Sequence, residues 1–239
     1  MNIAYYDLGE GSTVLFLHGA LLCAQTYQLT LATLAQNYRV IAPDVPGFGR
    51  SEMPDKPWDF QDYARFFVAF IEQLDLADIT VIGHSFGGGI ALALSVMTKR
   101  VTRRLLVNSA GIPYHCCKIR FLYLLFKEII TGPFRYKQIR PTLHCIKDLM
   151  RYGTTRPLDF FRIVSTLVKS SQMTYNFQNT NRIPTLVLHG TKDRIFPYDY
   201  AKQLHESIGA STFKTVQGDH GWCLYERTQL SAFVNTLYI

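Results

Sequence analysis

Short apolar runs alternate along the chain with longer segments whose apolar residues recur at helical spacing. The short runs predict strands at residues 3–6, 14–17, 79–82, 104–107, 186–188 and 213–216. The longer segments predict helices at residues 24–36, 60–76, 86–97, 197–208 and 226–237. Such alternation is typical of a mostly parallel sheet with helices on both faces.

Residues 112–182 interrupt this alternation and are rich in aromatic and basic side chains. The length of the chain, 239 residues, suits one α/β domain with an insertion better than two independent domains. We therefore expect a core formed by residues 1–111 and 183–239, and a helical cap, or lid, formed by residues 112–182.

One pentapeptide carries the first chemical signal. Gly83-His84-Ser85-Phe86-Gly87 fits the pattern G-x-S-x-G and lies between a predicted buried strand and a predicted helix rich in Ala and Leu. In that context the pattern is typical of a nucleophile elbow, a sharp turn that exposes the serine hydroxyl. The two outer glycines leave room for neighbouring backbone to approach closely. Ser85 is therefore the candidate nucleophile.

A serine hydroxyl needs a base to activate it, and the base needs a group that orients it. Where the serine lies on a nucleophile elbow, these partners follow it along the chain in the order Asp or Glu, then His. Asp193 ends a short turn after the predicted strand at residues 186–188, and His220 lies in a loop after the strand at residues 213–216. Asp193 is thus the candidate acid and His220 the candidate base.

A fourth segment lies near the start of the chain. The predicted strand at residues 14–17 runs directly into His18-Gly19-Ala20. A turn permitted by the glycine can aim a backbone N–H at the negative oxygen that develops during acyl transfer. The order of these four segments along the chain, and the strands that precede them, are those of a site in which an activated serine attacks an acyl group.

With these segments the chain resembles the α/β-hydrolase superfamily with a cap domain, over nearly its whole length outside residues 112–182. The resemblance implies that Ser85 is the nucleophile, that His220 acts as general base and then as acid, and that Asp193 orients His220. It also implies an oxyanion hole formed by the N–H groups of Ala20 and Phe86. Residues 44–51, Asp-Val-Pro-Gly-Phe-Gly-Arg-Ser, are similar to a structural loop of the family.

The chain also departs from the family pattern. The opening hairpin is reduced to one strand, which leaves a sheet of about seven strands instead of eight. Some relatives carry the acid after the strand that follows the elbow, but here that strand ends in Asn108-Ser109, so the role falls to Asp193. A serine at the elbow argues against haloalkane dehalogenase and epoxide hydrolase chemistry, which in this superfamily uses an aspartate.

We expect a hydrolase that cleaves a carboxylic ester or a related acyl compound through an acyl-enzyme, without metal or organic cofactor. The same scaffold also suits a carbon–carbon bond hydrolase of the meta-cleavage-product type, and an acyltransferase or cofactor-free perhydrolase. A non-catalytic ligand receptor is an alternative of a different class. Turnover of an activated ester that is lost on changing Ser85 separates an enzyme from a receptor.

Several classes of protein are disfavoured by the sequence. The glycines near Ser85 lack a Walker lysine, and no G-x-G-x-x-G follows the first strand, which argues against nucleotide binding. Five cysteines without C-x-x-C spacing argue against a disulfide framework and a zinc site. No nucleic-acid-binding motif is present. Since the sequence shows neither a secretory signal nor an apolar run of about 20 residues, we expect a cytoplasmic protein.

Positive charge is concentrated in residues 112–182. Twelve Lys or Arg against three Asp or Glu give this segment a net charge of +9, whereas the rest of the chain carries −2 and the whole chain +7. The charge fits a solvated helical face, an inward arginine that pairs with a substrate carboxylate, or weak docking on a membrane surface, with residues 121–130 as an interfacial helix. Because the cations are spread along the segment, the sequence favours an acidic substrate over the membrane. The apolar residues of the segment predict a pocket for an acyl or aromatic group.

Overall fold

The computed structural model describes residues 1–114, 118–136, 139–154, 157–171 and 183–238. Within them one sheet has the strand order β1-β3-β2-β4-β5-β6-β7. β1 pairs antiparallel with β3, and every other neighbouring pair is parallel. The strands are β1 (Tyr5–Leu8), β2 (Thr13–Leu17), β3 (Arg39–Pro43), β4 (Ile79–His84), β5 (Val101–Val107), β6 (Thr185–Gly190) and β7 (Ser211–Val216). This confirms the predicted sheet of seven mostly parallel strands.

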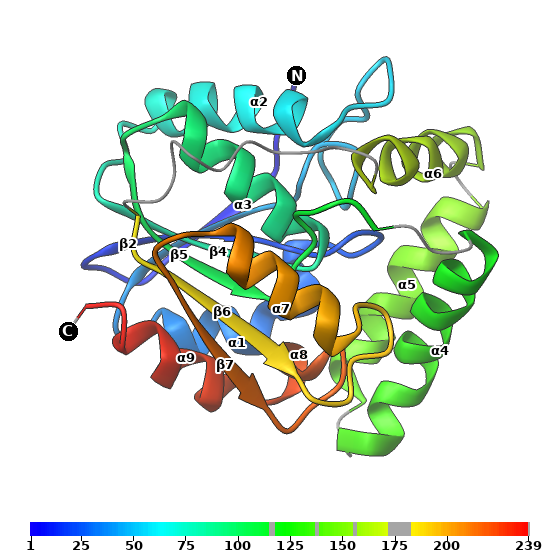
Figure 1. Ribbon diagram of the computed structural model, residues 1–239. Helices are drawn as coiled ribbons and strands as arrows, with labels where there is room; N and C mark the ends of the chain where they lie inside the picture. Colours follow the sequence, from blue (N-terminus) through cyan, green and yellow to red (C-terminus); the bar gives the residue numbers. More distant parts are fainter. Residues whose placement is uncertain (115–117, 137–138, 155–156, 172–182, 239) are drawn as a thin grey trace.

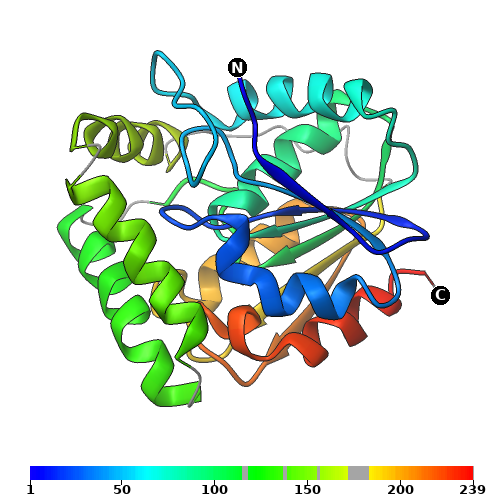
Figure 2. The same ribbon diagram turned by 180° about the vertical axis from the view of Figure 1, so that it is seen from behind.

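Helices cover both faces of the sheet (Figure 1). α2 (Phe60–Gln73) packs on α3 (Phe86–Met97) on one face. On the other face α1 (Gln28–Leu34) packs on α9 (Arg227–Asn235), and Figure 2 shows the blue α1 beside the red α9. α7 (Tyr198–Ser207) packs against β6 and β7. These helices confirm the predicted covering of a parallel sheet.

The centre of the sheet is the most buried part of the fold. Every residue of β4 is buried, and so are ten of the twelve residues of α3, from Phe86 to Ser95. Glycines 87–89 at the start of α3 allow this helix to lie close against neighbouring elements, because a Cβ at Gly88 would overlap Ser109. The turn between β4 and α3 is therefore buried and closely packed.

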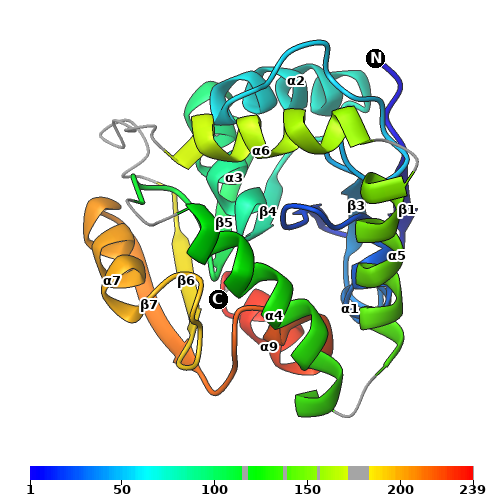
Figure 3. The same cartoon turned by 90° about the vertical axis from the view of Figure 1, so that its right-hand side faces the viewer.

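Between β5 and β6 the described residues form three helices of a helical insertion: α4 (Lys118–Tyr136), α5 (Arg140–Thr154) and α6 (Pro157–Ser171). They lie at the carboxyl ends of the parallel strands (Figure 1), and Figure 3 shows them facing the viewer. The turn that carries Ser85 also lies at these ends, so the insertion covers it. Cys116, Cys117 and the predicted end of the insertion at residue 182 lie outside the described residues. No helix in the described ranges has the length and apolar character needed to cross a bilayer.

The structure differs from the predicted elements in several places, and β3 lies outside the strand ranges predicted from sequence. The first strand is shifted to Tyr5–Leu8, where it pairs with β3. The helix predicted at residues 24–36 is divided into a 3-10 turn, η1 (Ala24–Tyr27), and α1. The break falls at Tyr27, whose ring packs on Phe16 and whose hydroxyl bonds to His84, so long-range contacts set the local backbone. A short helix that the sequence did not predict, α8 (Trp222–Tyr225), follows the loop of His220.

Candidate active site

Ser85 occupies a strained turn between β4 and α3. Its backbone angles are φ 52° and ψ −117°, a conformation that costs a non-glycine residue about 1–3 kcal/mol. The carbonyl of Ser85 accepts hydrogen bonds from the N–H groups of Gly88, at 3.0 Å, and Ala110, at 2.9 Å. Gly87 must lack a side chain, since a Cβ there would overlap the backbone of Leu17. The turn therefore has the strain and close packing expected of a nucleophile elbow.

The structure brings Ser85, Asp193 and His220 into one hydrogen-bonded chain. His220 Nε2 lies 2.9 Å from Ser85 Oγ, and His220 Nδ1 lies 2.8 Å from Asp193 Oδ2. Because a carboxylate only accepts, Nδ1 carries the proton and donates to Asp193, which leaves Nε2 to accept from the serine hydroxyl. The second carboxylate oxygen, Oδ1, accepts from the N–H groups of Ile195 and Phe196 at 2.8 and 3.0 Å. All three side chains are buried.

The surroundings of His220 set its proton affinity. Burial alone lowers the pKa of the imidazole, but attraction to Asp193 and the hydrogen bond to it outweigh burial, and Glu128 and Asp219 add to the effect. The net pKa of His220 therefore lies above its ordinary value of 6.5. A base with a raised pKa holds a proton more readily when it takes one from the serine.

Ala20 and Phe86 lie with Ser85 in the lining of the same pocket. Phe86 is the first residue of α3, where backbone N–H groups have no partner within the helix. Gly19, just before Ala20, lies so close to Ser85 that a Cβ on it would be 3.4 Å from the serine Cβ. The loop after β2 therefore lies beside the serine, where the predicted oxyanion hole requires it.

The loop at residues 44–51 supports the loop after β2 and takes no direct part in the site. Asp44 Oδ1 accepts from the N–H of Ala24 at 2.8 Å, and its Oδ2 accepts from the N–H of Arg50 at 2.9 Å. His18 Nε2 accepts from the N–H of Val45 at 2.8 Å. These bonds agree with the structural role that the sequence indicated for this loop.

His84 has a positioning role that the sequence did not reveal. Its Nε2 lies 2.9 Å from the backbone oxygen of His220, so Nε2 must carry the proton and donate. Its Nδ1 therefore accepts from the hydroxyl of Tyr27 at 2.6 Å, and that hydroxyl in turn accepts from the N–H of Gly19 at 3.2 Å. Burial lowers the pKa of His84 to about 3, which keeps it neutral. A buried relay thus links the loop after β2 to the backbone of His220.

Asn108 is a second support that sequence reasoning missed. Its Nδ2 donates to the backbone oxygens of Asp219 and His220, both at 2.8 Å, and its Oδ1 accepts from the N–H of Gly190 at 2.7 Å. The residue is fully buried, with φ 43°, a conformation that asparagine tolerates better than most residues. The position of Asn108 directly after β5 was visible in the sequence. There it indicated only that the acidic residue of some relatives is absent at this position.

His189 differs from His18 and His84, which also adjoin a glycine at the end of a strand. His189 is buried, but its Nδ1 has no hydrogen-bond partner among the described residues, whereas both ring nitrogens of His18 and of His84 are hydrogen-bonded. No group of three His, Cys, Asp or Glu side chains suited to a metal occurs in the part of the chain that the structure describes.

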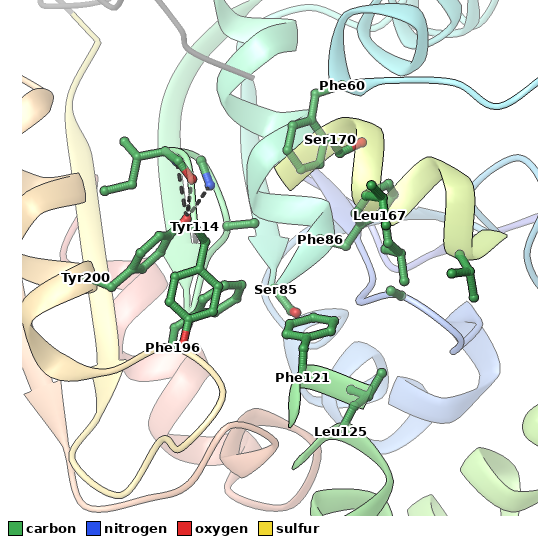
Figure 4. Close-up of a pocket in the computed structure, with 16 residues that line it drawn as sticks. Phe60, Ser85, Phe86, Tyr114, Phe121, Leu125, Leu167, Ser170, Phe196 and Tyr200 are labelled. Atoms are coloured by element: carbon green, nitrogen blue, oxygen red, sulfur yellow. Dashed lines mark hydrogen bonds between the residues drawn. The ribbon is translucent and has the colours of Figure 1, made fainter. Parts of the chain in front are cut away.

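Ser85 lies at the base of an apolar pocket of about 860 Å³, including its opening (Figure 4). Figure 4 shows Tyr114, Phe196 and Tyr200 on one side of the serine, and Phe121 of α4 beside it. Tyr200 also ties down the start of the insertion, because its hydroxyl bonds to the backbone of Ile112. The other lining residues are Ala20, Phe60, Phe86, Ala110, Gly111, Leu125, Val164, Leu167, Val168 and Ser170.

The part of the pocket lining that the structure describes does not show the inward arginine that the sequence favoured as a reason for the charge of the insertion. Its sixteen lining residues include no Lys or Arg. Arg135 and Lys169, two cations of the insertion, pair with acidic residues outside the pocket. The side chains of Lys118, Lys137, Arg151, Arg156 and Arg182 are not among those described. Within the described residues the pocket suits a neutral, apolar group.

Comparison with known proteins agrees with this fold. The model of the alpha/beta hydrolase family matches residues 14–233. The chain belongs to this family. It is 29% identical over 249 residues to the non-heme chloroperoxidase of Streptomyces lividans, covering 92% of this chain and 90% of that protein.

Solved structures show the same fold for this alpha/beta hydrolase. The esterase RhEst1 from Rhodococcus sp. ECU1013 has a TM-score of 0.80 at 24% identity, with 98% of this chain and 93% of that chain covered. A meta-cleavage product hydrolase from Pseudomonas fluorescens IP01 has a TM-score of 0.75 at 23% identity, with 99% and 93% covered.

In this alpha/beta hydrolase the end of α4 is bound to the loop of His220. Arg135 forms ion pairs with Asp219 at 2.9 Å and with Glu128 at 2.7 Å. The hydroxyl of Tyr136 accepts from the N–H of Asp219 at 3.2 Å. Two carboxylates of this network therefore lie close enough to influence His220, one of them carried by the insertion.

Asn108→Asp tests the support beneath His220. Aspartate tolerates the same backbone conformation, but its carboxylate cannot donate to the two carbonyl oxygens, so we expect unfolding free energy to fall by about 2–4 kcal/mol. Urea denaturation of the variant and of Asn37→Asp, an exposed control, measures the difference. Equal stability of the two variants would contradict the assigned bonds.

The pH dependence of activity tests the charges around His220. The base must be neutral to accept the serine proton, so kcat/KM should fall as pH drops through the raised pKa, above 6.5. Glu128→Gln removes a nearby negative charge and should move this acidic limb to lower pH. Glu226→Gln, which removes an exposed carboxylate, should leave the limb in place. An unchanged limb in Glu128→Gln would disprove the coupling.

Proposed function

We propose that this protein hydrolyses a carboxylic ester with a neutral, apolar acyl group, through an acyl-enzyme formed on Ser85. The observation that carries the proposal is the hydrogen-bonded chain from Ser85 through His220 to Asp193 at the base of an apolar pocket. The family and its esterase-like fold support the same reaction class.

In the first half of the reaction Ser85 Oγ attacks the ester carbonyl carbon and its proton passes to His220 Nε2. The carbonyl oxygen becomes negative and accepts hydrogen bonds from the N–H groups of Ala20 and Phe86. As the carbon–oxygen bond to the alcohol breaks, His220 gives its proton to the leaving alcohol. The acyl group then remains on Ser85, with its chain in the apolar pocket.

In the second half a water molecule replaces the alcohol. His220 takes a proton from the water as its oxygen attacks the acyl carbon, and the same two N–H groups stabilise the second oxyanion. The bond to Ser85 Oγ breaks, the serine recovers the proton from His220, and the carboxylic acid leaves. Asp193 holds His220 in the required orientation throughout and remains ionised.

Perhydrolysis is a second candidate, favoured by the similarity to a non-heme chloroperoxidase. Hydrogen peroxide in place of water would attack the same acyl-enzyme and release a peracid. The carbon–carbon bond hydrolase is less well supported, because its acidic substrates would lack a cationic partner among the described lining residues.

A series of activated esters tests the proposal. A neutral acyl ester should exceed the same chain with a terminal carboxylate in kcat/KM by about tenfold or more, because the pocket desolvates the charge without pairing it. The series should include peroxide as acceptor and a dienoate diketone for carbon–carbon cleavage.

Two serine variants complete this experiment. Ser85→Ala should abolish turnover of every ester, whereas Ser170→Ala, at the other serine of the pocket lining, should retain it. Preference for the carboxylate ester, or cleavage of the diketone without that of any ester, would refute the proposal. Absence of all turnover would favour a ligand receptor.

A further inference from the structure

α4 is apolar on two opposite sides. Phe121 and Leu125 line the pocket on its inner side. The opposite side carries an outer stripe of large apolar residues at spacings of three or four, formed by Ile119, Tyr123, Phe126, Ile130 and Phe134. Phe134 is 82% exposed and Ile119 79% exposed. A second apolar stripe that faces outward on a helix is unusual for a simple solvated surface, where polar side chains are expected.

The neighbouring helices also carry exposed apolar side chains. Leu143 on α5 is exposed, and so are Leu158 and Phe161 on α6. α5 packs against both α4 and α6, and Figure 3 shows all three helices on the same side of the molecule. Exposed apolar groups of this size on adjoining helices usually mark an interaction surface.

The acidic side chains of the three helices are buried or paired with a cation. Glu128, with a side chain 8% exposed, pairs with Arg135, and Asp148 accepts from the hydroxyl of Thr26 at 2.9 Å. Asp159, 18% exposed, lies beside Arg162 on its own helix. The outer face of the insertion therefore presents no well-exposed carboxylate within the described residues.

Cations flank the outer stripe instead. Arg120, Arg140 and Lys147 are exposed. Lys127 extends over the ring of Tyr123, with its Nζ 5.7 Å from the ring centre. Large apolar side chains bordered by Lys and Arg are typical of helices that lie in a membrane interface.

We propose that the outer face of the insertion docks on a membrane surface of anionic lipid. The outer stripe enters the boundary between headgroups and acyl chains, and Arg120, Lys127, Arg140 and Lys147 attract the lipid phosphates. This reverses the preference drawn from sequence, which favoured an acidic substrate as the reason for the charge. The proposal does not depend on the reaction at Ser85.

Charge and shape favour this occupant over the others. A simple solvated face would carry polar side chains where Ile119 and Phe134 stand. A symmetric pair of two copies would bring two strongly positive faces together, which like charges oppose. Ile119 and Phe134 are also largely exposed, so they are accessible for insertion into lipid.

Vesicle sedimentation of the full chain tests the proposal. The protein should bind vesicles of phosphatidylcholine with phosphatidylserine and leave vesicles of phosphatidylcholine alone largely free. Binding should weaken in about 1 M salt, where the Debye length is about 3 Å. The double variant Ile119→Ser/Phe134→Ser should bind anionic vesicles about tenfold or more weakly, because its apolar anchors are lost.

Two controls make the result decisive. Val96→Ser/Met97→Ser, at partly exposed apolar residues of the core helix α3, and Ser85→Ala should both bind anionic vesicles like the unchanged protein. Circular dichroism should show every variant folded. Failure to bind anionic vesicles, or equal binding by the stripe variant, overturns the proposal. A different outcome would assign the face to self-association. In that case the unchanged protein would sediment as a dimer, the stripe variant would sediment as a monomer, and neither would bind vesicles.

Discussion

The position of the His220 backbone is the constraint on which the site depends. Its carbonyl oxygen accepts one hydrogen bond from His84 at the end of β4 and another from Asn108 directly after β5. Both donors are buried, and a buried polar group that loses its partner costs about 1–3 kcal/mol. The loop therefore has little freedom, and the imidazole reaches Ser85 and Asp193 from a fixed backbone.

The same bonds connect parts of the site with different roles. His84 belongs to the turn that presents Ser85, and through Tyr27 it reaches Gly19 in the loop after β2. Asn108 reaches Gly190, which precedes the turn of Asp193. The proposed nucleophile, base, acid and oxyanion loop are thus parts of one buried network, so displacement of one part strains the others.

The three side chains that the structure brings into one hydrogen-bonded chain could be singled out from sequence because their signals are local. Ser85 lies in a pentapeptide with its own strand and helix, and Asp193 and His220 each follow a recognisable strand. The supports could not be predicted in this way. His84 and Asn108 act on a residue more than 100 positions away, and only the sheet order brings them together. Likewise Tyr27 interrupts a helix that its local sequence favours, because its ring and hydroxyl are held elsewhere.

The charge of the insertion shows a second limit of sequence. The excess of Lys and Arg was evident from the sequence. Whether these cations face the pocket or the solvent depends on which side of α4 and α5 packs against the core. Glu128 and Asp148 face the core, while the described residues that line the pocket are uncharged. Composition alone did not separate a cation that faces the pocket from one that faces solvent, and only the packing of the helices distinguishes the two for the described residues.

Covalent labelling by a fluorophosphonate probe tests the central claim, that Ser85 is activated by its buried partners, most directly. Intact-mass measurement should show one adduct on the unchanged protein and on Ser170→Ala, and none on Ser85→Ala. Asp193→Asn should fold normally and label far more slowly, because its imidazole is no longer held as a base. Full labelling of Ser85→Ala, or an unchanged labelling rate in Asp193→Asn, would contradict the account.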